Sequence, residues 1–406
     1  MQTNGYRIQT LFKGLLVVLA LWLSTLANAE TRNSEAPNTE TYNTKSTSIE
    51  THGAQAKRPK VTFINPGFAD KGFWKAVTDT MTAAAEQLGF ELEVRSADRQ
   101  WPKMVREAEQ VIGLADKPDF LILVNEHQQG ARLLELADKA GIPTLMLLNS
   151  LTQEQRDSYG APRKELKNWL GSLTPNNEIA GYEMAQSLVH AIEARKNSNS
   201  ASIALLTLAG DNTTPASLFR LQGLDRALDE YPVLKEQRRI SVNWSADEAY
   251  KRTQLWLKSG QPLSAIWAAN DPIALGALNA IREAGLKPGI DVAVSGLNWS
   301  PEAIEHVRNG EMTLTHGGHF LAGAWIMVML YDYVKGHDFA STSTEVNFPM
   351  TAINQTNAPS YLEHFGDQQW SSIDFKAFSL SHSSPQSSQQ SEYQFTLTKL
   401  LEAVQK

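Results

Sequence analysis

Asn270 and Asp271 stand where a short apolar segment gives way to a segment with helical spacing. The apolar run at residues 265–269 predicts a buried strand of a parallel sheet. Pro272 fits the first turn of a helix, because the N–H that it lacks would have no partner there. Open α/β sheets bind ligands at the carboxyl ends of their strands, and an amide beside a carboxylate can serve several hydroxyl groups. The pair is therefore a candidate polyol site, although Asp271 could instead only cap its helix.

Further polar side chains follow two other predicted strands. Asn125 and Glu126 come directly after the apolar run 119–124, and Asn149 follows the run 143–148. Parallel strands bring their carboxyl ends to one edge of a sheet, so we expect these side chains to face the same cleft. A buried Glu126 without a partner would be costly, and it must therefore face a ligand, an arginine or water.

Arg220 lies within a predicted helix over residues 215–230. Its planar guanidinium could hold a ring oxygen and a neighbouring hydroxyl together. The alternative is a surface ion pair with Asp225 or Asp229.

Phe73 and Trp74 open the predicted helix 73–88 and are candidate stacking walls for a sugar or another flat ligand. Adjacent residues at the start of a helix point in different directions, so we expect one of them in the core.

His316 and His319 flank two glycines. Two histidines make an incomplete metal site, and no matching carboxylate motif accompanies them. We therefore expect no metal, a hydrogen bond from His316 to the ligand, and hinge motion at the glycines. The sequence also holds no nucleophile elbow, His-Glu-x-x-His, phosphate loop or dinucleotide fingerprint, so we expect neither a cofactor nor an enzyme.

Composition narrows the class of protein. The chain has 406 residues, of which 42% are hydrophobic and 20% charged, with a net charge of −7 and no basic block. We therefore expect no nucleic-acid partner. Because cysteine is absent, disulfides, thiolate metal sites and acylated-cysteine anchors are excluded.

The first 29 residues have the pattern of a signal peptide. Arg7 and Lys13 precede an apolar run at residues 15–23, and Ala27 and Ala29 form a small-x-small cleavage site. The alternative is an uncleaved anchor. Residues 30–58 are polar and predict a disordered linker. Because a signal peptide directs export, the folded part is expected to be exported.

Strand and helix patterns alternate from residue 60 onward, which predicts parallel strands with right-handed crossovers. The predicted fold class is α/β, with two doubly wound parallel-sheet lobes. The predicted strands are 61–64, 90–94, 119–124, 143–148, 169–173, 202–208, 240–244, 263–269, 292–297, 310–315 and 345–353. The predicted helices are 73–88, 104–115, 131–140, 179–192, 215–230, 247–259, 272–284 and 320–334.

Four segments within about residues 60–350 resemble the type I periplasmic sugar-binding proteins, whose ligand-binding domain is shared with the lactose-repressor family. They are the strand–Asn-Asp–helix segment 269–278, the Arg-x-x-Gly segment 220–224, the turn 295–298 and the first loop 65–74. The exported N-terminus stands where the repressors have DNA-binding helices, which excludes a repressor role.

The resemblance implies two lobes joined by a hinge that the chain crosses three times, near Thr174, Gly318 and Asn347. The first lobe would comprise 59–174 with 318–347, the second 175–317 with 348–380, and 381–406 would form a tail. The ligand would lie between the lobes. Asn298 stands where the family has an aspartate, which removes a charge, and Trp299 is either a further stacking wall or a loop packing residue.

The implied function is a periplasmic solute-binding protein that delivers a small polar ligand, a sugar or polyol, to the permease of an ABC transporter. The segment 366–379 is similar to the C-terminal extension of the periplasmic autoinducer-2 receptor. This likeness keeps open the alternative of a co-receptor for a membrane sensor kinase or chemoreceptor, and a periplasmic enzyme is the third possibility.

Overall fold

The computed structural model describes residues 57–195, 202–382 and 392–404. The predicted signal peptide, and the predicted linker up to residue 56, lie outside the described residues. Within the described part, no helix is long and apolar enough to cross a membrane.

Two six-stranded sheets organise the described residues, with strand orders β11-β5-β4-β3-β1-β2 and β12-β10-β9-β8-β6-β7. Every pairing is parallel except that of β10 with β12. The first sheet holds β1 (Lys60–Asn65), β2 (Glu91–Ser96), β3 (Phe120–Leu123), β4 (Thr144–Leu147), β5 (Trp169–Pro175) and β11 (Glu345–Phe348). The second holds β6 (Ile203–Ala209), β7 (Leu234–Ser241), β8 (Ala265–Ala268), β9 (Ala293–Leu297), β10 (Leu314–Gly317) and β12 (Thr351–Ile353). The predicted α/β fold with two parallel-sheet lobes is confirmed.

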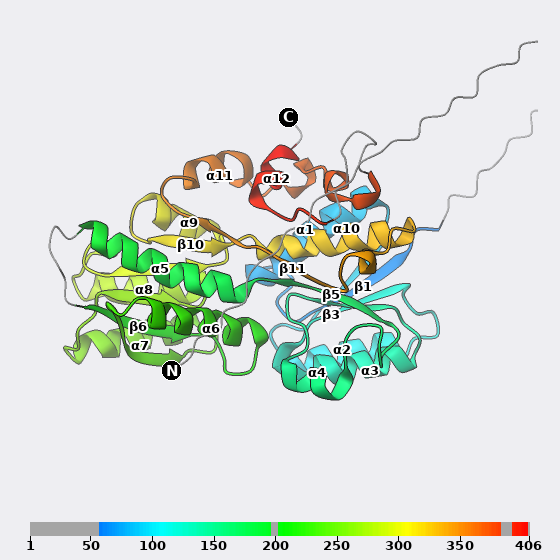
Figure 1. Cartoon of the computed structure of the whole chain (residues 1–406), viewed down its shortest axis with the longest axis horizontal. Coiled ribbons are helices and arrows are strands. Elements are labelled where there is room, and N and C mark those ends of the chain that lie inside the picture. Colours follow the sequence, from blue (N-terminus) through cyan, green and yellow to red (C-terminus); the bar gives the residue numbers. More distant parts are fainter. Residues whose placement is uncertain (1–56, 196–201, 383–391, 405–406) are drawn as a thin grey trace, which may run out of the picture. The chain divides into compact units, whose positions relative to one another are not determined.

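Helices flank both sheets (Figure 1). They are α1 (Gly72–Leu88), α2 (Trp101–Ile112), α3 (Gly130–Lys139), α4 (Gln153–Tyr159), α5 (Asn177–Arg195), α6 (Pro215–Glu230), α7 (Ala246–Lys258), α8 (Asp271–Glu283), α9 (Pro301–Arg308), α10 (Ala322–Val334), α11 (Ala358–Phe365) and α12 (Leu397–Glu402). In the first lobe α1 packs on α10, and α2 packs on α3. In the second lobe the pairs are α5 with α6 and α7 with α8.

The chain passes between the sheets three times, after β5, after β10 and after β11. The predicted strand 345–353 is in fact two strands. β11 pairs with β5 in the first sheet and β12 pairs with β10 in the second. Pro349 lies between them, and because proline has no N–H it cannot continue a hydrogen-bonded ladder.

Other element predictions need correction. β7 begins at Leu234, not at residue 240, because this edge strand is largely polar and half-exposed and so gives no apolar signal. β10 begins at Leu314 instead of 310, after Gly310 with a positive φ of 76°. Helix α9 was not predicted, although Ser300 caps it and Pro301 opens it.

The C-terminal extension contacts both lobes. Helix α11 packs on α9, whereas the turns at Trp370–Ser372 and Phe375–Phe378 pack on α1 and α10. Residues 348–380 were all predicted to belong to the second lobe, but the part from residue 370 onward packs on helices of the first. Aromatic periodicity reveals that a segment is buried but not which surface buries it.

The chain's last described segment docks on α10 and on the extension itself. Phe395 stacks on Trp325 of α10 with ring centroids 4.9 Å apart, and Asp374 N–H donates to the Ala403 carbonyl. The Ser/Gln-rich stretch at 383–391 lies outside the described residues.

Candidate ligand-binding site

A cavity of about 440 Å³ lies where loops from the two sheets meet. Its first-lobe lining is Phe68, Lys71, Gly72, Phe73, Trp74, Arg99, Glu126, Leu148, Asn149 and Pro175; the remaining lining is Asn177, Thr214, Ala216, Arg220, Asn243, Trp244, Ser245, Asn270, Pro272, Asn298 and His319. Most of these residues follow the carboxyl end of a strand, as expected for parallel sheets.

Arg220 lies deep in this lining, with only 3% of its surface exposed. Its Nε–H donates to Asn177 Oδ1 at 2.9 Å and its Nη1 donates to the Ala269 carbonyl at 2.8 Å. Burial lowers the pKa of Arg220 to about 9, opposed by the nearby charge of Asp271, so the side chain is protonated at neutral pH. The alternative of a surface ion pair with Asp225 or Asp229 is wrong, since Arg220 is buried and its partners are Asn177 and the Ala269 carbonyl.

Ligand contact and helix capping were both open roles for Asn270 and Asp271, and the structure gives both to Asn270. Asn270 lines the cavity and is also the helix cap, because its Oδ1 accepts from Ile273 N–H at 3.0 Å. Asp271 is fully buried behind the wall and accepts from Ser300 and Thr315. Burial raises the pKa of Asp271 to about 6 despite those hydrogen bonds.

Phe73 and Trp74 both border the cavity, although one was expected in the core. Trp74 also serves the core, being 7% exposed, and the two rings meet edge to face at 5.3 Å. Phe73 stacks on His319 with centroids 4.4 Å apart. Trp244 forms an opposing wall beneath Arg220, whose guanidinium carbon lies 5.7 Å from the ring centroid.

Glu126 faces the cavity with an arginine as its charged neighbour. Arg99 Nη1 lies 3.9 Å from its carboxylate. Burial raises the pKa of Glu126, the charge of Arg99 opposes that shift, and the charge of Asp211 adds to it.

Asn149 joins the lobes directly, because its Oδ1 accepts from Ala216 N–H at 3.1 Å. Asn125 does not line the cavity and instead supports the loop that carries Asn149. Its amide donates to the Ser150 carbonyl and to Gln155 Oε1, and its Oδ1 accepts from Gly130 N–H.

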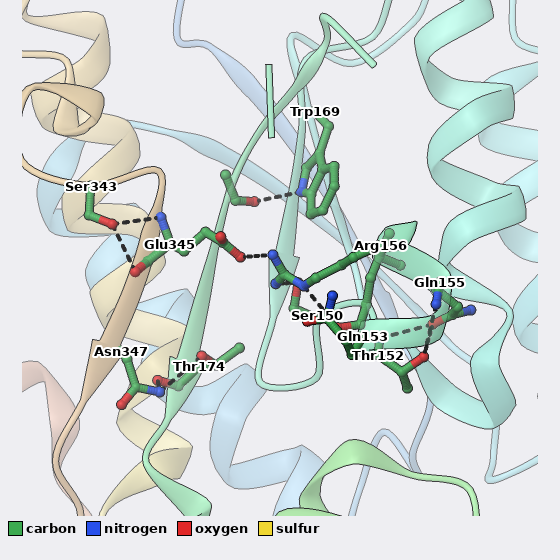
Figure 2. A network of polar contacts seen from close by, with 12 residues as sticks. Ser150, Thr152, Gln153, Gln155, Arg156, Trp169, Thr174, Ser343, Glu345 and Asn347 are labelled. Carbon is green, nitrogen blue, oxygen red and sulfur yellow. Dashed lines mark hydrogen bonds and ion pairs between the residues drawn. The ribbon is translucent and has the colours of Figure 1, made fainter. Parts of the chain in front are cut away.

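The same loop is held from the other side by Arg156 of α4 (Figure 2). Arg156 donates to the Leu151 carbonyl and to Ser150 Oγ, and it forms an ion pair with Glu345 of β11. The loop after β4 is therefore fixed between α4 and the strand that leads into the third passage.

Two further predicted residues lie behind the cavity wall. Trp299 Nε1 donates to the Thr351 carbonyl, and its ring packs on Tyr361, so the packing alternative describes it. His316 is fully buried with Nε2 2.7 Å from Glu183. It is the second histidine, His319, that borders the cavity. Among the described residues, no cluster of three His, Asp or Glu side chains could hold a metal ion.

Sequence reasoning missed several lining residues. Asn177 and His319 follow predicted strands, and the strand-end rule that selected Asn270 would have selected them too. Trp244 was placed inside the predicted strand 240–244, whereas β7 ends at Ser241. Lys71 and Phe68 lie in the first loop, where only the aromatic pair was considered.

Comparison with known proteins agrees with this geometry. Residues 61–338 match the model of the periplasmic binding protein domain. The structure of a periplasmic sugar-binding protein from Pseudomonas fluorescens superposes with a TM-score of 0.75 and 33% identity, covering 84% of this chain and 99% of that one. A xylitol-binding protein of Mycolicibacterium smegmatis is 24% identical over 288 residues, which is 70% of this chain and 74% of that protein. A galactofuranose-binding protein of Escherichia coli is 22% identical over a stretch that covers 60% of this chain and 72% of that protein.

The family match spans well over half of the chain. The matched residues form most of the two-lobe fold described above. The chain belongs to the periplasmic binding protein family.

Proposed function

We propose that the protein captures a small polyhydroxylated ligand, a sugar or polyol, in the periplasm and delivers it to the membrane permease of an ABC importer. The observation that carries the proposal is the cavity at the strand ends of both lobes. It combines amide side chains, a buried guanidinium and aromatic walls.

These groups suit such a ligand. The aromatic rings of Phe73, Trp74 and Trp244 offer apolar faces to sugar C–H groups. Asn270 and Asn298 supply donors and acceptors for hydroxyls, and Arg220 can hold two oxygens at once. Binding requires no chemistry from these groups, so we propose a binding protein and not an enzyme.

The named relatives extend the support. They bind xylitol and galactofuranose, and D-apiose import binding proteins from two bacteria are 25–28% identical. These relatives lend no support to the sensor alternative, which rested on the C-terminal extension. Export through cleavage after Ala29 remains part of the proposal, and N-terminal sequencing of secreted protein tests it by finding Glu30 first.

A thermal-shift screen tests the function. The protein is unfolded, washed free of bound ligand, refolded and screened against sugars and polyols. A ligand at about 100 times its Kd adds about 2.7 kcal/mol of stability, which raises the midpoint by several degrees. No response from refolded protein to any of these compounds would contradict the proposal.

Two variants locate the site. Arg220→Ala removes the guanidinium, and Asn270→Ser removes the amide but keeps a capping oxygen for α8. Both should abolish the ligand-induced shift. Arg226→Ala is the matched control, because Arg226 lies on the same helix with an exposed side chain paired to Glu178, and its response should match the wild type.

A further inference from the structure

The cavity lining carries more positive than negative side chains. Of the described residues that line the cavity, Lys71, Arg99 and Arg220 are basic and Glu126 alone is acidic. Every other strongly polar side-chain group in the lining is an amide, a hydroxyl or an imidazole. Burial and the charge of Arg220 lower the pKa of His319 well below its usual value, so this ring is neutral.

Glu126 does not cancel this excess. When ionised it neutralises Arg99, its neighbour at 3.9 Å, which leaves Lys71 and Arg220. When protonated, as burial favours, it leaves all three cations without an anion in the lining.

Two carboxylates outside the lining, whose charges act on Glu126 and Arg220, are already engaged. Asp211 accepts from Thr213, Thr214 and Trp244. Asp271 accepts from Ser300 and Thr315. Neither forms a hydrogen bond with Arg220. Both lower the overall positive potential without presenting an anion at the cavity surface.

Arg220 has donors to spare. A guanidinium has five N–H groups. Three point at acceptors in the described residues: Nε–H at Asn177, one Nη1–H at the Ala269 carbonyl, and one Nη2–H at His319 Nε2, 3.4 Å away. One N–H on each Nη atom therefore remains to donate to a ligand, and charge-assisted bonds from a guanidinium to a carboxylate are strong.

His319 adds a further donor. Because its Nε2 accepts from Arg220, the proton of the neutral ring lies on Nδ1. That atom is buried and has no hydrogen-bond partner in the described residues. Leaving a buried donor unpaired costs free energy, so this ring is a second unsatisfied polar group beside Arg220.

We infer that the ligand is a polyhydroxylated carboxylic acid, a sugar acid, whose carboxylate accepts from the free Nη N–H groups of Arg220 while its hydroxyls contact the asparagines of the lining. The inference rests on the proposed function and narrows it. Asn298, which lines the cavity, is an amide and brings no negative charge that would repel such a ligand.

Matched pairs of acid and neutral compounds test this inference by calorimetric titration of refolded protein. D-galacturonate is compared with D-galactose, D-glucuronate with D-glucose, and D-gluconate with D-glucitol. For at least one pair the acid should bind about tenfold more tightly or better, since a charge-assisted bidentate contact is lost in the neutral partner. Arg220→Gln should remove the preference.

Asn298→Asp sharpens the test, because it adds one negative charge to the lining with almost no change in volume. It should weaken the acid by about tenfold or more through like-charge repulsion and leave the neutral partner unweakened. Asn279→Asp is the control, since Asn279 is exposed on α8, outside the cavity, and should leave both affinities unchanged.

The outcomes separate the two proposals. If neutral sugars bind as tightly as their acids or more tightly, the acid ligand is refuted while the proposed function stands. Tighter binding of D-galactose 1-phosphate than of any carboxylic acid also refutes it. If neither acids nor neutral compounds bind, both proposals fail.

Discussion

Arg220 and Asp271 are both buried and opposite in charge, yet they form no direct hydrogen bond. Three of the five N–H groups of Arg220 donate to Asn177, the Ala269 carbonyl and His319. The carboxylate of Asp271 accepts from Ser300 and Thr315. Each charge is stabilised by separate partners, and the guanidinium stays free to meet a ligand.

Asp271 gives stability a pH dependence. Burial raises its folded pKa to about 6, above its ordinary value of 3.8. The folded state therefore binds the proton more tightly than the unfolded state. Its contribution to the free energy of unfolding should be fully present below about pH 4 and fall as pH rises to about 6, by about 3 kcal/mol at most.

Urea unfolding of the wild type and Asp271→Asn between pH 4 and 7 measures this effect. The asparagine cannot titrate, so the cost of the substitution should be largest at pH 4 and shrink toward pH 7. A cost that stays constant with pH would show that the pKa of Asp271 is not raised.

Residue-level prediction from the sequence succeeded where position alone decides. Asn270 and Asn149 line the cavity because they follow strand ends, which the pattern reveals, whereas Arg220 lines it from helix α6. It failed between His316 and His319, because Gly318 with φ of 91° turns the chain between them. That turn leaves one ring against Glu183 and the other against Phe73.

At the scale of elements, α5 and α6 cross closely through glycines. A Cβ on Gly181 would come 2.0 Å from the Arg220 carbonyl, and one on Gly223 would come 1.9 Å from the Glu178 carbonyl. The position of Arg220 therefore depends on this crossing.

Gly181→Ala should push the two helices apart. We expect a stability loss of about 1–3 kcal/mol from overpacking, together with weaker ligand binding because Arg220 moves. Denaturant unfolding and titration of the same preparation measure both. Gly113→Ala is the control, since Gly113 has right-handed helical dihedral angles (φ −84°, ψ −3°) and its nearest contact would be 3.3 Å. An unchanged affinity in Gly181→Ala would show that ligand binding does not depend on this helix crossing.

The docked tail should stabilise the first lobe. Phe395 is 3% exposed against Trp325, so Phe395→Ala should cost about 3–5 kcal/mol. Phe219→Ala, at a ring 42% exposed, should change stability by less than about 0.5 kcal/mol. Equal effects of the two variants in thermal unfolding would refute docking of the tail.

Element prediction worked for apolar strands and long helices, because buried faces leave a periodic signal. It failed at β7, whose polar sequence reflects an exposed edge, and at the third passage, where Pro349 divides one apparent strand into two. The packing of residues 370–380 on the first lobe could not be predicted, since no local pattern encodes a partner surface.

At the scale of the whole molecule, the three passages between the sheets make a hinge possible, and Asn149 to Ala216 is a hydrogen bond that opening would break. We expect small-angle X-ray scattering to show a smaller radius of gyration when the ligand identified by the screen is added at saturation. Asn149→Ala should bind more weakly, because it loses this contact between the lobes. An unchanged radius on saturation would contradict hinge closure.

Ligand capture in this cavity is tested most directly by calorimetric titration of refolded wild-type protein and Arg220→Ala with the ligand that the screen identifies. We expect one ligand per chain, recovered chemically unchanged, and no measurable binding to Arg220→Ala although that variant remains folded. Unaltered binding to folded Arg220→Ala would place the ligand outside this cavity, and conversion of the ligand would show that the protein is an enzyme.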